Sequence, residues 1–150
     1  FTANVRKYYE GLAMPGLYIN SEVEIMSGKP LDSSRTLGDI DVLLINKETK
    51  QIVCIEAKNY VESRTVYELI QQNRKIVDNL LSHVLYRDTL FKANIEKFKF
   101  YVPEIDDSYV VRTIFLTYHE NAYNYFDHED IGIIFISAMD IIENPLVVFA

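Results

Sequence analysis

Two acidic residues and one lysine occupy regular positions on two neighbouring apolar segments of the 150-residue chain. Asp41 lies near the start of the first segment, and Glu56 and Lys58 lie at the end of the second. If both segments are β-strands, Glu56 and Lys58 point to the same side, because successive side chains alternate between faces. The polar residues 47–50 are few enough for a hairpin turn, which brings Asp41 level with Glu56. The sequence therefore predicts that two carboxylates and an ammonium group meet at one end of a sheet.

This combination of side chains favours metal-assisted chemistry. Carboxylate oxygens without His or Cys form a hard-oxygen site suited to Mg²⁺ or Mn²⁺. A nearby lysine adds positive charge where a metal-bound phosphate gains negative charge during reaction. Asp, Glu and Lys are depleted in strands, so strand propensity does not explain their presence. The alternative is a solvent-facing hairpin whose surface ion pair contributes only about 0–1 kcal/mol.

The elements that must position these residues follow from hydrophobic periodicity and turn residues. Thr65 and Glu68 form a capping box at the start of a long helix, along which apolar residues recur at helical spacing. Two nearly continuous apolar segments near the end indicate strands of a sheet covered on both faces. The expected order is helix 5–13, strand 17–26, loop 27–37, strands 40–46 and 51–57, helix 65–85, helix 88–100, turn 103–108, strand 110–118, loop 121–130, strand 131–136 and a helix from residue 137. This order predicts one α/β domain over residues 1–150, with a mixed central sheet flanked by helices, either complete or part of a longer protein.

The acidic and lysine positions resemble the signature of a known family. Asp41 followed by Glu56-Ala57-Lys58 is similar to the Asp…(Asp/Glu)-x-Lys pattern of the PD-(D/E)XK nuclease superfamily, which includes restriction endonuclease-like and Holliday junction resolvase-like proteins. The segment 38–41, Gly-Asp-Ile-Asp, resembles the Gly-Glu-Ile-Asp form of some members. The expected element order also resembles the restriction endonuclease-like αβββαβ core of that superfamily. The resemblance covers about residues 5–87.

The resemblance implies roles for the residues that match its motif. Asp41 and Glu56 would hold Mg²⁺ or Mn²⁺ together with the Ala57 carbonyl, and Lys58 would orient or activate the attacking water. One or two bound ions would lower the pKa of a bound water and stabilise the leaving oxygen. The implied activity is hydrolysis of phosphodiester bonds, with DNA as the expected substrate and RNA as an open alternative, in restriction, repair or defence.

Other residues match the family less directly. Members often add a Glu on the first helix and a Gln on the helix after the lysine, and Glu10 and Gln71 or Gln72 occupy such places. Ile40 stands where the eponymous proline would be, and Ile76 stands four residues after Gln72, so the Gln-x-x-x-Tyr motif of the exonuclease branch is absent. We expect Glu10 and Gln72 to join Asp41, Glu56 and Lys58 as catalytic residues.

Composition limits the class of protein and its location. With 49% apolar and 25% charged residues, the chain has the composition of a soluble globular domain. Cys54 is the one cysteine and cannot form an internal disulfide, and no apolar run reaches the roughly 18–20 residues that span a bilayer. No basic segment followed by an apolar one resembles a secretory signal. We expect a cytoplasmic protein without a membrane partner.

The formal net charge of −7 argues against a simple basic nucleic-acid-binding module. The charge is uneven, because residues 58–99 hold eight basic and five acidic residues, whereas residues 100–150 hold one and nine. We therefore expect a nucleic acid to lie along residues 58–99, with specificity supplied by a homodimer or an additional domain. The alternative function is a catalytically inactive nucleic-acid-binding or interaction module with the same fold.

Overall fold

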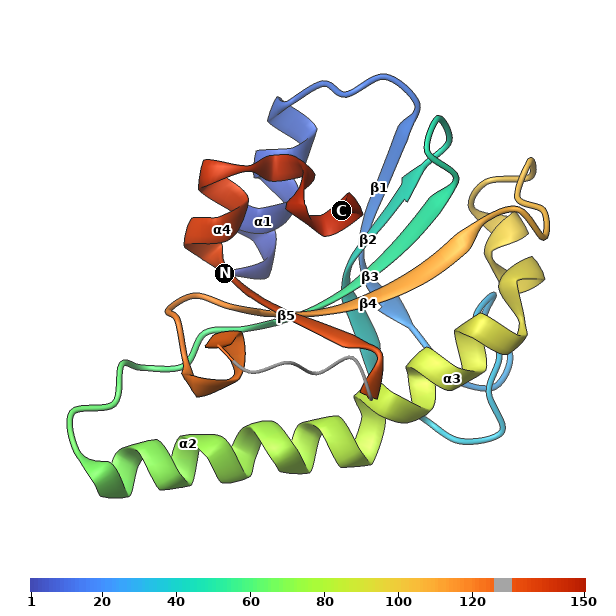
Figure 1. Ribbon diagram of the computed structural model, residues 1–150. Helices are drawn as coiled ribbons and strands as arrows, with labels where there is room; N and C mark the ends of the chain where they lie inside the picture. Colours follow the sequence, from blue (N-terminus) through green and yellow to red (C-terminus); the bar gives the residue numbers. More distant parts are fainter. Residues whose placement is uncertain (126–130) are drawn as a thin grey trace.

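The computed structural model describes residues 1–125 and 131–150 and contains a five-stranded sheet whose strands lie side by side in chain order. The first three strands form an antiparallel meander, and the third, fourth and fifth are parallel to one another. The strands are β1 (Leu17–Glu24), β2 (Asp39–Asn46), β3 (Gln51–Lys58), β4 (Val110–Thr117) and β5 (Ile133–Ser137). The predicted α/β class and mixed central sheet are confirmed (Figure 1).

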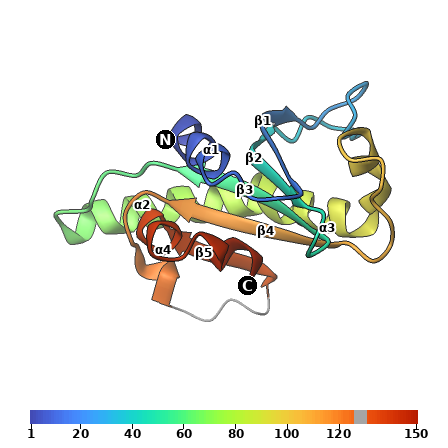
Figure 2. The same cartoon turned by 90° about the horizontal axis from the view of Figure 1, so that it is seen from above.

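Helices cover both faces of this sheet. Figure 2, seen from above, shows α1 and α4 in front of the sheet and α2 and α3 behind it. The helices are α1 (Thr2–Gly11), α2 (Val66–Asn79), α3 (Leu85–Ala93) and α4 (Ala138–Glu143), with 3₁₀ turns at Ile95–Phe100, Ala122–Tyr125 and Pro145–Phe149. The flanking helices predicted from the sequence are therefore present. Among the described residues, no helix is long and apolar enough to cross a membrane.

The long helix begins where the capping residues predict. The Thr65 hydroxyl accepts a hydrogen bond from the Glu68 amide at 3.2 Å, and Glu68 Oε2 accepts one from the Arg64 amide at 2.6 Å. Both contacts satisfy backbone donors near the helix start. Residues 59–65 connect the end of β3 to this helix start.

The helix after β3 is longer than the sequence indicates. A π-helical segment, Leu80–Val84, joins α2 to α3, so the expected separate helix 88–100 is wrong as one element. Residues 88–93 continue α3, which ends where the Asn94 amide side chain donates to the Leu90 carbonyl at 2.8 Å. The loop expected at 121–130 contains a 3₁₀ turn, and its last five residues lie outside the described part of the chain.

The core is divided by the sheet into different regions. On the face covered by α1 and α4, one apolar cluster includes Tyr9, Leu44, Ile55 and Ile141. On the face covered by α3, a second cluster contains Phe91 and Phe98 against β2 and β3, and α2 takes part in a third that includes Ile76, Leu80, Val84, Phe115 and Phe135. The polar residues described next lie where α2 passes into α3.

Candidate functional site

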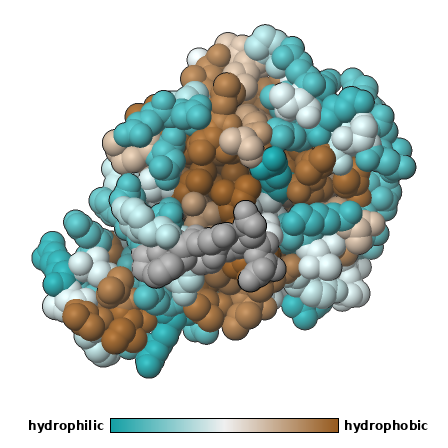
Figure 3. Space-filling view, viewed as in Figure 1, coloured by the Kyte–Doolittle hydropathy of each residue, from teal (hydrophilic) through white to brown (hydrophobic). Residues whose placement is uncertain are grey.

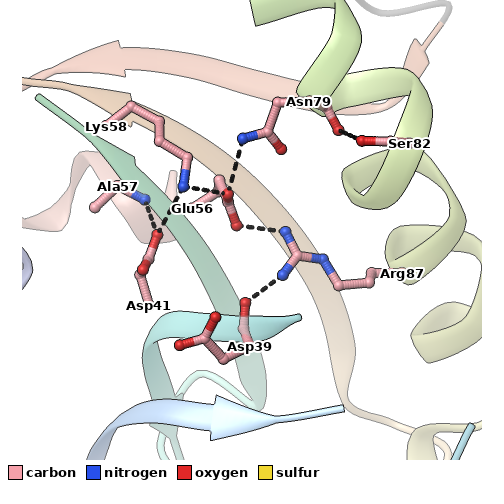
Figure 4. Close-up of polar contacts among 8 residues, drawn as sticks. All are labelled: Asp39, Asp41, Glu56, Ala57, Lys58, Asn79, Ser82 and Arg87. Carbon is pink, nitrogen blue, oxygen red and sulfur yellow. Dashed lines mark hydrogen bonds and ion pairs between the residues drawn. The ribbon is translucent and has the colours of Figure 1, made fainter. Parts of the chain in front are cut away.

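The pairing of β2 with β3 determines the position of the site. Val42 is opposite Ile55, so one step further along the ladder Asp41 and Glu56 are neighbours. Lys58 Nζ lies 2.6 Å from Glu56 Oε1 and 3.7 Å from Asp41 Oδ2. The Ala57 amide donates to Asp41 Oδ2 at 2.7 Å. The structure therefore brings Asp41, Glu56 and Lys58 together on one face of the sheet (Figure 4).

Glu56 is the most enclosed carboxylate of the site, and its side chain is 8% exposed. Its Oε1 accepts from Lys58 and, at 3.2 Å, from the Asn79 side-chain amide at the end of α2. Its Oε2 accepts from the guanidinium of Arg87, whose side chain is 7% exposed. The other end of that guanidinium donates to the main-chain carbonyl of Asp39 (Figure 4).

Arg87 and Asn79 are site residues that the sequence analysis did not find. Arg87 follows the buried Val84 by three residues and precedes the buried Phe91 by four, so it falls on the apolar stripe of the helix. Arginine is almost never fully buried without a partner. A cation on an apolar stripe is thus a sequence signal for a buried acidic partner, although it does not identify Glu56.

The charges of the site shift the pKa values of its groups in different directions. Burial opposes ionisation of Glu56, but the Arg87 guanidinium and the Lys58 ammonium outweigh it and lower the pKa of that carboxyl. Burial also opposes the charge of Lys58, yet Glu56 and Asp41 outweigh it and raise the pKa of the amine. Burial raises the pKa of Asp41, and the negative charge of Glu56 raises it further. Asp41 is thus the carboxylate with the least compensated negative charge.

The site presents oxygen atoms of the kind that binds divalent cations. Asp41 Oδ1 has no hydrogen-bond partner among the described residues. The amide and carbonyl of a strand residue point to the same side, so the Ala57 carbonyl also faces β2 and Asp41. Such a set of carboxylate and carbonyl oxygens is what Mg²⁺ and Mn²⁺ prefer. No group of three or more His, Cys, Asp or Glu residues suitable for a metal ion occurs in the described ranges.

Two residues expected at the site lie away from it. Glu10 is on α1, which covers the opposite face of the sheet, and it pairs with Arg6 at 2.7 Å on the surface. The Gln72 side chain bonds to Ser63 Oγ at 2.9 Å and to the Val61 carbonyl at 3.4 Å. Neither side chain contacts Asp41, Glu56 or Lys58.

An open crevice of about 630 Å³ begins directly after Lys58. The extended residues 59–64 form one wall and the first turns of α2 form the other, and the bonds of Gln72 to Ser63 and Val61 hold the walls together. Tyr60, Tyr67, Arg64 and Lys75 are among its lining residues. The projecting end of α2 also exposes apolar side chains (lower left of Figure 3). Val66, the first residue of α2, is 75% exposed.

Comparison with known proteins adds no identity to this geometry. No family model matches the chain, and no curated protein matches it. The arrangement of Asp41, Glu56, Lys58 and Arg87 therefore carries the functional argument.

Proposed function

We propose that this protein is a metal-dependent nuclease of the PD-(D/E)XK type that hydrolyses phosphodiester bonds, with DNA as substrate. The observation that carries the proposal is the meeting of Asp41, Glu56 and Lys58 from two adjacent strands on one sheet face. The element order α1, β1, β2, β3, α2, β4 supports it, because it agrees with the αβββαβ order of the restriction endonuclease-like core.

In this function, Asp41, Glu56 and the Ala57 carbonyl would hold the Mg²⁺ or Mn²⁺. The bound ion would lower the pKa of a water and polarise the phosphoryl oxygen. The Ala57 amide orients Asp41, and Asn79 and Arg87 orient Glu56. The raised pKa of Lys58 keeps this side chain protonated at neutral pH, so it acts by orienting water and by stabilising phosphate charge, not as a general base.

The crevice after Lys58 supports a path for the substrate. Among the described residues, Arg64 and Lys75 form no ion pair, whereas Arg87 is committed to Glu56 and Lys92 to Asp88. Glu62 and Glu68 also line the crevice, so Arg64 and Lys75 offer a substrate two local cations without a net positive charge. Cations that neutralise phosphates contribute much of the affinity for nucleic acid, and tyrosine rings stack on unpaired bases. A DNA strand that follows the crevice would reach Asp41 and Glu56 at its Lys58 end.

A second candidate function is a catalytically inactive nucleic-acid-binding module. It is favoured by one observation, that both oxygens of Glu56 are already paired without a metal ion. Such a closed cluster of ion pairs also serves as a structural link between a sheet and a helix. Binding of DNA without cleavage would distinguish this function from the nuclease.

The test is cleavage of supercoiled plasmid and of short single- and double-stranded DNA with Mg²⁺ or Mn²⁺. We expect cleavage that a chelator abolishes and that Asp41→Ala and Lys58→Ala each remove. The matched control is Asp39→Asn, which removes a carboxylate from the same strand but keeps the main-chain carbonyl that Arg87 contacts. Absence of cleavage with either metal across these substrates would refute the nuclease.

The role of the crevice has its own test, made without metal. Arg64→Glu and Lys75→Glu should each weaken binding of a fluorescent single-stranded DNA about tenfold or more in low salt, because each reverses a cation at the crevice. Lys29→Glu is the control, since Lys29 lies in the exposed segment between β1 and β2 and pairs with Glu24. Equal loss in all three variants would contradict the proposed path.

A further inference from the structure

Arg87 connects three elements of the fold through one buried side chain. It is carried by α3, it donates to the Glu56 carboxylate on β3, and it donates to the main-chain carbonyl of Asp39 on β2. A guanidinium presents its donors in a rigid planar fork and cannot lose its charge at physiological pH. Arg87 therefore places a permanent positive charge beside Glu56 and fixes the direction of that carboxylate.

Lys92, another cation on α3, does not make the contacts with the strands that Arg87 makes. Lys92 forms an ion pair with Asp88 at 2.8 Å, but its side chain is 43% exposed and the pair lies within one turn of α3. That pair links no other element. Arg87, at 7% exposure, instead contacts the two strands that carry Asp41 and Glu56. A charge is costly to bury unless its partners are fixed, so the location of Arg87 requires both contacts to persist.

The balance of charge limits how many metal ions the site accepts. Asp41 and Glu56 supply two negative charges, and Lys58 and Arg87 supply two positive charges. One divalent cation beside Asp41 leaves the cluster with a charge that a phosphate would offset. A second divalent cation would meet the Arg87 guanidinium, which already pairs with Glu56, and the remaining nearby acid, Asp39, contacts Arg87 through its main-chain carbonyl and not through its carboxylate.

From these contacts we infer that the site takes a single divalent cation. We infer also that Arg87 is a positioning residue, whose guanidinium supplies the positive charge that a second ion would otherwise supply. This inference rests on the proposed nuclease function for its catalytic part. The count of bound ions does not depend on that function.

The first experiment counts ions. The intact protein is titrated with Mn²⁺, and binding is measured by calorimetry and by the electron paramagnetic resonance signal of free Mn²⁺. We expect one site per chain, which Asp41→Ala removes. Two equivalents bound at the site would overturn the inference. One bound equivalent without cleavage of any DNA would contradict the proposed nuclease function but support the single-cation site. Two bound equivalents with cleavage would support the nuclease function but contradict the single-cation site.

The second experiment separates positioning from metal affinity. Arg87→Met should bind Mn²⁺ severalfold more tightly, because a positive charge leaves the site, and should cleave DNA at least tenfold more slowly, because Glu56 loses its fixed direction. Arg87→Lys retains the charge but lacks the fork that reaches both strands, so it should bind Mn²⁺ as the parent protein does and cleave at an intermediate rate. It provides the test if Arg87→Met does not fold.

The control is Lys99→Met, which removes an exposed cation that forms no ion pair among the described residues and should change neither quantity. The inference fails if Arg87→Met cleaves as fast as the parent protein. It fails equally if Mn²⁺ affinity and cleavage fall together in both Arg87 variants, since this is the result expected from general structural damage.

Discussion

The two faces of the sheet are built from the same strands but bury different groups. On the face covered by α1 and α4, β2 and β3 contribute Leu44, Val53 and Ile55 to an apolar cluster. On the face covered by α2 and α3, β3 contributes Glu56, and the helix contributes Arg87. The α2 and α3 face also holds apolar residues of β3, such as Ile52, so alternation along one strand supplies an apolar core to one side and an apolar core with a charged cluster to the other.

The two faces of the sheet therefore contribute differently to the stability of the fold and to the chemistry of the site. Apolar burial on the α1 side stabilises the fold at about 25 cal/mol per Å² of apolar surface. The ions on the α3 side lose hydration on burial, and their mutual attraction only offsets this cost. The α1 face therefore contributes apolar packing, whereas the α3 face combines apolar packing with charges in a defined arrangement. Substitutions on the two faces should have separable effects.

The largest expected effect is on catalysis, from Lys58→Met. This change removes the ammonium group that orients water and stabilises phosphate charge. Cleavage should therefore slow by about 10²–10⁴-fold, the range typical of a lost catalytic group. The matched change on the other face is Leu44→Ala, which should cost about 2–5 kcal/mol of unfolding free energy. Cleavage rates and urea unfolding midpoints measure the two. The division between the faces is wrong if Leu44→Ala, while still folded, slows cleavage as much as Lys58→Met.

The next effect is on stability, from Arg87→Met. Removing Arg87 leaves Glu56 Oε2 without its partner, while Lys58 still pairs with Oε1, so the loss should be about 3 kcal/mol of unfolding free energy, the lower end of the range for a broken buried ion pair. The double variant Glu56→Gln with Arg87→Met should be more stable than Arg87→Met alone by about 0.5–3 kcal/mol, because the buried carboxylate that lost its partner is removed while Lys58 keeps Asp41. Urea unfolding at neutral pH without metal tests both. Strictly additive losses would show that the pair is not coupled.

A smaller effect, of opposite sign, is expected at Asp41. The pKa of this carboxyl is raised in the folded protein, so its ionisation costs stability at neutral pH, and the cost disappears as the pH falls below that raised value. Asp41→Asn should therefore stabilise the metal-free protein by about 1 kcal/mol at neutral pH and by less in acid. The lowered pKa of Glu56 acts oppositely, because its contribution is present above the usual carboxyl pKa and is lost in stronger acid. The measurement is thermal unfolding of the parent protein and of Asp41→Asn from neutral to acid pH, with and without Mn²⁺. A destabilised Asp41→Asn protein without metal would contradict the prediction.

The smallest effect is expected at Glu10. This residue forms an exposed ion pair with Arg6, so Glu10→Gln should change the unfolding free energy by only about 0–1 kcal/mol and leave cleavage unchanged. A tenfold slower cleavage would show that α1 takes part in the site from across the sheet, and the separation of the two faces would then be lost.

Local patterns in the sequence predicted the parts of the structure that local physics determines. Alternation and a short turn gave the β2–β3 hairpin, and Thr65 and Glu68 gave the start of α2. The neighbouring positions of Asp41, Glu56 and Lys58 follow from that hairpin. The mixed sheet followed from the order of apolar segments.

Other features depend on how distant elements pack. The partner of Arg87 lies 31 residues earlier in the chain, and no local pattern identifies it. Glu10 was expected at the site from its place in the order of elements, but order alone does not determine which face of the sheet α1 covers. Gln72 was expected from its place on α2, yet its side chain bonds to the residues 59–65 that precede the helix.

The π-helical segment Leu80–Val84 sets the angular phase between the two helices that it joins. In an uninterrupted α-helix, residues eight apart, such as Asn79 and Arg87, lie about 80° apart around the axis. A π turn contains one more residue than an α turn, so it rotates the following residues back and aligns the two side chains on Glu56. If Leu80–Val84 adopted α-helical geometry without any deletion, Asn79 and Arg87 would lie about 80° apart around the axis, and their side chains would no longer both point at Glu56.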